Sequence, residues 1–207
     1  MRCNLVMAGT AAAVLALAGC GSEYQVGPPG SGGSASGEAG SNEAGSASAT
    51  RSPADDKRLS ENLERIALAM HNHHDTHKKF PPAAIRGDDG QALLSWRVAL
   101  LPFLGQKALY DEFHLKEPWD SPHNKGLIER MPGVYRTGAA GAGQTSVMVF
   151  VDPQTPFGGE EGPRFRDIRD GTANTIMCVV AGADKAVPWT KPEDLPFNAA
   201  DPPSAMG

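Results

Sequence analysis

The sequence predicts an α+β domain: a long N-terminal amphipathic helix packed on a mostly antiparallel β-sheet, with short helices and long ordered loops. Three observations support this. Apolar residues recur at helical spacing after residue 53, two β-rich apolar runs follow in the second half of the chain, and turn residues separate those runs. Helices followed by short strands are typical of this fold class.

The long helix is predicted over residues 54–78. Ser52 is suited to the N-cap and Pro53 to the first helical turn, while the segment Phe80-Pro81-Pro82 ends the helix. One apolar stripe runs along it, formed by Leu59, Leu63, Ile66 and Met70.

Two shorter helices are predicted next, over 93–104 and 121–130, with a second turn over 106–113 between them. Ser95 is placed to cap the first helix, and Ser121-Pro122 repeats a cap-then-proline signal at the start of the second.

The spacing of apolar residues then changes. Residues 145–151 and 175–180 are β-rich runs, 170–172 is a turn, and 163–168 is a short strand or turn. The proline-rich stretch 188–203 is expected to be extended and ordered by docking on the domain.

The N-terminus predicts export and lipid attachment. Residues 5–18 form an apolar run too short to span a bilayer, and the run closes on Leu17-Ala18-Gly19-Cys20, which looks like the lipobox of a bacterial lipoprotein. We expect a signal peptide over 1–19, acyl chains on Cys20, and a location in the cell envelope outside the cytoplasm. Because Gly21 follows the cysteine, the outer membrane is slightly favoured. A plain secretory signal is the alternative.

Residues 20–52 are expected to be a lipid-anchored, disordered tether, because a stretch of Gly, Ser and Ala cannot bury enough apolar surface to fold. Residues 53–207 then form one globular domain. The chain has a net charge of −5 and no basic patch of the kind that binds nucleic acid, so no nucleic-acid partner is expected. Cys178 lies in an apolar run and is expected to be a buried hydrophobic residue.

The sequence offers two candidate metal sites. His73 and His77 are spaced i, i+4 in the predicted helix, a pairing that can hold a transition metal, but ring packing and hydrogen bonds to loop carbonyls are the favoured role. Acidic residues of the C-terminal loops, Asp194 and Asp201 among them, are the alternative for calcium. No cofactor is expected otherwise.

Three further residues are candidates for binding or for anchoring loops. Trp119 and Trp189 each follow a proline, and either grip a sugar or partner chain or cap the core from loops; the second role is favoured. Arg97 lies between apolar neighbours and is expected to form a buried salt bridge, with Asp120 or Asp170, or contacts with carbonyl groups.

An enzyme, most plausibly a hydrolase, is the less favoured class. Asp120, Ser121 and His123 lie together in the sequence, but adjacent residues rarely converge as a triad, and turn-and-cap chemistry explains them better.

Several ordered motifs across residues 57–198 resemble the bacterial family called domain of unknown function 1559. They are His71-Asn72-His73-His74-Asp75, Phe80-Pro81-Pro82-Ala83, Leu94-Ser95-Trp96-Arg97-Val98, Leu101-Pro102-Phe103-Leu104, Pro118-Trp119-Asp120-Ser121-Pro122-His123-Asn124, Asp170-Gly171-Thr172-Ala173-Asn174-Thr175 and Val187-Pro188-Trp189-Thr190-Lys191-Pro192-Glu193-Asp194-Leu195.

The resemblance implies a pilin-like fold, since typical members look like type IV pilins and pseudopilins, some of which hold calcium in a C-terminal loop. It implies no catalytic residues. The prepilin segment of those members is replaced here by a lipobox and a tether, so filament assembly by the usual route is not expected. We therefore predict a non-enzymatic binding or scaffolding protein, with the membrane as partner through lipid on Cys20 and an envelope protein or glycan as a further partner.

Overall fold

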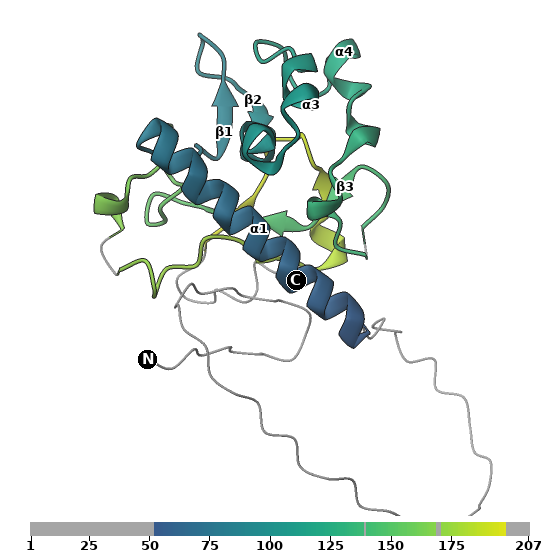
Figure 1. Cartoon of the computed structure of the whole chain (residues 1–207). Helices are drawn as coiled ribbons and strands as arrows, with labels where there is room; N and C mark the ends of the chain where they lie inside the picture. The colour runs from purple at the N-terminus through teal and green to yellow at the C-terminus, as the bar shows by residue number, and fades with distance from the viewer. Residues whose placement is uncertain (1–51, 139, 169–170, 198–207) are drawn as a thin grey trace, which may run out of the picture.

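A computed structural model describes residues 52–138, 140–168 and 171–197 (Figure 1). Its helices, with 3-10 helices labelled η, are α1 (Pro53–His77), α2 (Trp96–Ala99), η1 (Leu101–Leu104), α3 (Lys107–Glu112), α4 (Pro122–Lys125), η2 (Ile128–Arg130), η3 (Gly133–Tyr135), η4 (Phe165–Asp167) and η5 (Ala183–Lys185). Its strands are β1 (Ala84–Arg86), β2 (Ala92–Ser95), β3 (Gln144–Thr145), β4 (Val147–Met148), β5 (Phe150–Val151), β6 (Val179–Val180), β7 (Val187–Pro188) and β8 (Leu195–Pro196). The predicted α+β class with a long first helix is confirmed.

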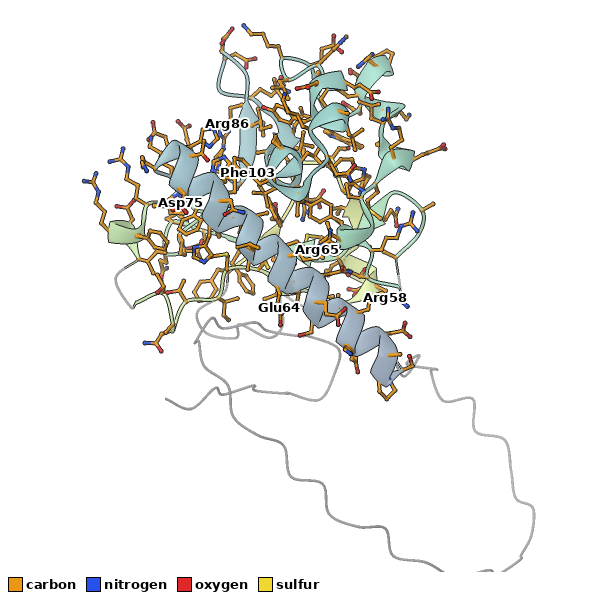
Figure 2. All side chains as sticks on the ribbon, in the orientation of Figure 1. Arg58, Glu64, Arg65, Asp75, Arg86 and Phe103 are labelled. Carbon is orange, nitrogen blue, oxygen red and sulfur yellow. The ribbon has the colours of Figure 1, made fainter. Side chains whose placement is uncertain are left out.

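Helix α1 crosses the molecule diagonally in Figure 1, with β1, β2, α3 and α4 to one side of it. The Ser52 hydroxyl accepts a hydrogen bond from the Asp55 amide (3.2 Å), as expected of an N-cap. The predicted stripe is buried, with exposures between 0% and 5%. Charged side chains cover the outer face, including the labelled Arg58, Glu64 and Arg65 (Figure 2).

The prediction of a helix from residue 93 was wrong at its start. Residues 92–95 form β2, which pairs antiparallel with β1 through a turn that contains Gly90 at a φ of 80°. A short apolar run does not distinguish a buried strand from a helix, and β1 itself was not predicted. The helical part begins at Trp96, where Ser95 is the N-cap of α2.

The predicted helix over 121–130 is broken into two pieces. Ser121 caps α4 through its hydroxyl (3.1 Å from the Asn124 amide), and the chain then passes through Gly126 and Leu127 before η2 begins.

The segment 144–151 lies at the centre of the strand pairing. It contributes β3, β4 and β5, which pair with β7, β6 and β8 in turn; the first two pairs are antiparallel and the last is parallel. The strands therefore form two-stranded ladders rather than one continuous sheet. Of the predicted run 175–180, only Val179–Val180 is a strand. Residues 163–168, predicted as a short strand or turn, contain the single 3-10 turn η4.

One large hydrophobic cluster holds these elements together. The α1 stripe shares it with Trp96 of α2, Val147 of β4 and Val180 of β6. The part of the proline-rich stretch that the structure describes docks through β7 and β8. Within the described ranges, no helix combines the length and the apolar character needed to cross a bilayer.

Candidate functional site

A small apolar cavity lies beside the C-terminal end of α1. Its volume is about 70 Å³, and its lining comes from His71 of α1, from Phe80 just after that helix, and from residues within 156–168 and 172–177. The residues that shape it include His71, Phe80, Phe157, Ile168, Ile176 and Met177. A cavity of this size takes a single aliphatic or aromatic group rather than a whole small molecule.

The chain turns sharply at this end of the helix to form the cavity wall. Lys78 takes the left-handed conformation (φ 61°, ψ 16°), and its amide donates to the carbonyl of His74. The Phe80 amide then donates to the carbonyl of Pro163 (2.8 Å), which joins the two walls. Gly162 permits this approach, because a Cβ at that position would collide with the Phe80 carbonyl oxygen.

Aromatic rings form the rim of the cavity. His71 stacks on Phe165 (centroids 5.7 Å apart) and meets Phe80 edge-on (5.6 Å), while His74 contacts both phenylalanines. Phe165 and Ile176 remain 38% and 41% exposed, so apolar surface continues from the cavity to solvent. This arrangement suits the capture of an apolar group from a partner.

His73 and His77 lie one turn apart on α1, with ring centroids 4.3 Å apart. His73 Nδ1 donates to the Lys79 carbonyl (2.8 Å), and His77 Nδ1 donates to the His73 carbonyl (3.1 Å). Burial lowers the pKa of His73, and the neighbouring His77 and His74 lower it further, whereas the bond to Lys79 opposes the shift. His73 therefore has the bond to a loop carbonyl that the sequence predicts, whereas His77 bonds to a carbonyl within α1.

Arg97 lies at the polar centre of the core and is fully buried. Its Nη2 donates to Asp194 Oδ1 (2.8 Å), and its Nε donates to the Val147 carbonyl (2.9 Å). The ion-pair partner is therefore Asp194 and not Asp120, which is exposed, or Asp170, which lies outside the described residues. The pairing was not foreseen because the two residues are 97 positions apart.

The Asp194 carboxylate therefore has all of its observed partners within the core. Its Oδ1 also accepts from Trp96 Nε1 (3.1 Å) and from the Val149 amide (3.0 Å). Burial raises the pKa of Asp194, and Arg97 and the hydrogen-bond donors oppose that shift. A carboxylate with these partners is not placed as a calcium ligand on a surface loop. Asp201 lies outside the described residues.

The two loop tryptophans occupy different places. Trp189 is fully buried, donates from Nε1 to the Ile128 carbonyl (3.0 Å) and stacks on Tyr135, so its ring offers no face to a ligand. Trp119 is half-buried against the main cluster, with Lys191 Nζ 5.7 Å from its ring centroid.

The three residues that could serve a hydrolase, Asp120, Ser121 and His123, do not form a catalytic triad. The Ser121 hydroxyl caps α4, whereas His123 Nε2 lies 2.7 Å from the Glu112 carbonyl and its ring stacks on His114 at 3.6 Å. Asp120 is exposed, and among the described residues it forms no hydrogen bond with Ser121 or His123. In the part of the chain that the structure describes, no three His, Cys, Asp or Glu side chains gather as metal ligands.

Cys178 lies in the core, and burial raises the pKa of its thiol to about 12. The signal segment, Cys20 and the tether lie outside the described residues. Sequence reasoning missed this cavity, because its walls come from segments that are distant in sequence. The unusual exposure of Ile176 and Phe165 is a property of the fold and left no signal in the sequence.

Comparison with known proteins identifies one family. No curated protein and no solved structure matches the chain. Residues 60–156, which run from α1 through the central strand segment, match the model of a family described as proteins of unknown function (DUF1559). Over residues 60–156, the chain is similar to the DUF1559 family, in agreement with the resemblance that its motifs indicate.

Proposed function

We propose that this protein is a lipoprotein of the cell envelope that acts by binding or scaffolding and catalyses no reaction. The observation that carries the proposal is the tetrapeptide Leu17-Ala18-Gly19-Cys20, which closes a short apolar run and precedes a Gly/Ser-rich tether. Two or three acyl chains on Cys20 would make a durable anchor, which one chain does not.

The geometry of the domain suits this role. The tether joins at Ser52, next to the first residue of α1, whereas the apolar cavity lies near its last turns. At a rise of 1.5 Å per residue, His71 lies about 27 Å from Pro53 along the helix axis. Ser52 and the proposed binding surface are thus separated along one helix.

The polar side chains of the domain also favour binding over catalysis. Arg97 bonds to Asp194 and to a backbone carbonyl, and the Ser121 hydroxyl caps α4. None of these three side chains lines the cavity. The lining of the cavity is apolar apart from His71 and two threonines. Its proposed occupant is an apolar group presented by an envelope protein or glycan.

Fractionation of cells tests the anchor. The wild-type chain is expected in the membrane fraction, mainly the outer membrane, and Cys20→Ser is expected to leave the membranes. Cys3→Ser is the matched control, because it removes the other cysteine of the leader without touching the lipidation site. Equal membrane retention of Cys20→Ser and wild type would contradict the proposal.

Crosslinking in whole cells tests the binding surface separately. Ile176→Asp places a charge at the cavity, and Leu68→Asp places the same charge at an exposed leucine on the outer face of α1. The crosslinked partner is expected to be lost with Ile176→Asp and retained with Leu68→Asp. Retention in both variants, or loss in both, would place the binding surface elsewhere.

A further inference from the structure

We infer that His73 and His77 form a two-histidine site for a divalent transition metal ion of the class Cu²⁺, Ni²⁺ or Zn²⁺. The site lies on the last turns of α1, next to the apolar cavity and separate from it, since neither histidine lines the cavity.

Helix geometry brings the two rings together. Residues at i and i+4 lie on one face of a helix, and here the ring centroids are 4.3 Å apart with the planes inclined by 31°. Because α1 is regular across both positions, this spacing is set by the backbone.

The hydrogen bonds fix which nitrogen is free to bind a metal. A carbonyl oxygen only accepts, so the bonds to Lys79 and His73 carbonyls require a proton on Nδ1 of both rings. In a neutral imidazole the lone pair is then on Nε2. Neither Nε2 has a hydrogen-bond partner among the described residues, so both are available. Backbone carbonyls in this position are the usual supports of metal-binding histidines.

Packing holds the rings in place. Phe103 meets His73 and His77 edge-on, at 5.4 Å and 5.8 Å, and Figure 2 shows Phe103 beside the C-terminal part of α1. His73 is buried, whereas His77 is exposed. One wall of the site is thus rigid while the other is open to solvent, which allows entry of the ion.

The charges around the pair do not block a cation. Lys79 is paired with Glu161, and Lys78 Nζ donates to the Asp75 carbonyl (2.8 Å), so both ammonium groups have partners of their own. The described residues supply no third His, Cys, Asp or Glu ligand, so water fills the remaining positions. Two imidazoles select Cu²⁺, Ni²⁺ or Zn²⁺ over Mg²⁺ or Ca²⁺, which prefer oxygen.

The test is a titration of NiCl₂ into the full-length chain, produced without a polyhistidine tag and with Cys3 and Cys20 replaced by serine so that no leader thiol binds metal. One Ni²⁺ per chain is expected to bind, and the melting midpoint is expected to rise with it. His77→Gln is expected to weaken binding about tenfold or more and to abolish the rise. Because His77 is exposed, that variant is expected to keep its fold.

His71→Gln is the matched control: it removes a neighbouring histidine outside the pair and is expected to bind Ni²⁺ as wild type does. Electron paramagnetic resonance of the Cu²⁺ form is expected to show two imidazole nitrogens in wild type and one in His77→Gln. The inference is overturned if wild type and His77→Gln bind Ni²⁺ equally, if wild type shows no binding, or if His71→Gln loses binding to the same extent as His77→Gln.

Discussion

Arg97 Nη2 lies 2.8 Å from Asp194 Oδ1, and the two side chains are 0% and 2% exposed. Arg97 belongs to α2, its Nε reaches the carbonyl of Val147 in β4, and Asp194 directly precedes β8. One buried ion pair therefore ties the helical half of the domain to the central strand segment and to the C-terminal stretch.

Arg97→Met is expected to lower the free energy of unfolding by about 3–5 kcal/mol, because it leaves the Asp194 carboxylate buried without its counter-ion. Urea unfolding followed by circular dichroism measures this. Adding Asp194→Leu to Arg97→Met is expected to recover part of the loss, since both buried charges are then gone.

Arg130→Met is the control for that pair. Arg130 forms a bidentate pair with Glu112, but the two side chains are 49% and 45% exposed. Its loss is expected to leave the free energy of unfolding nearly unchanged, because solvent screens an exposed ion pair. If Arg97→Met and Arg130→Met lowered the free energy of unfolding equally, the buried Arg97–Asp194 pair would not be a main source of stability.

Leu63→Ala is expected to destabilise the domain by about 2–5 kcal/mol, because Leu63 is 1% exposed within the stripe of α1 and truncation leaves a cavity. Leu68→Ala removes the same atoms from the same helix at a position that is 61% exposed. Its effect is expected to stay within about 0.5 kcal/mol. Thermal melts of both variants decide whether the stripe is the packed face.

Lys78→Gly is expected to stabilise the domain by about 0.5–1 kcal/mol. Lys78 is the one non-glycine residue with a positive φ among the described residues, and glycine adopts that conformation without the steric cost of a Cβ. Lys79→Gly, one residue further, gains nothing from this effect and loses the pairing with Glu161. A loss of stability in Lys78→Gly would contradict the prediction.

The Cys178 thiol is expected to resist alkylation in the folded protein. Its pKa of about 12 leaves almost no thiolate at pH 8, and its ordinary pKa in the unfolded chain is 9.0. Because the pKa of the Cys178 thiol is higher in the folded chain, its contribution to the free energy of unfolding is complete below pH 9. That contribution is lost as pH rises from 9 toward 12.

Peptide mapping after iodoacetamide treatment at pH 8 measures the reaction, with urea-unfolded protein as reference. Ile176→Cys places a thiol two residues away at a position that is 41% exposed, and it is expected to react quickly. Rapid alkylation of Cys178 in the folded chain would show that the thiol is accessible.

Local features of the fold were predictable from the sequence. The Ser52 cap and the stripe from Leu59 to Met70 form α1 as expected, because caps and helical spacing act within a few residues. The Ser95 and Ser121 caps were predictable for the same reason.

Features that depend on distant contacts were not predictable. β1 and β2 exist because they pair with each other, and the apolar sequence of β2 fits a helix equally well. The segment 144–151 reads as one strand but changes partner twice. Likewise, the cavity near His71 joins segments up to 106 positions apart (His71 to Met177), so its walls meet only in the folded chain.

The proposed function depends on lipid at Cys20 that holds the chain at a membrane. Mass spectrometry of the N-terminal peptide of the protein, extracted from its own cells, tests it most directly. The expected peptide begins at Cys20 and carries a diacylglyceryl group, with or without a third acyl chain. A peptide with an unmodified Cys20 sulfur, or one that still begins at Met1, would contradict it.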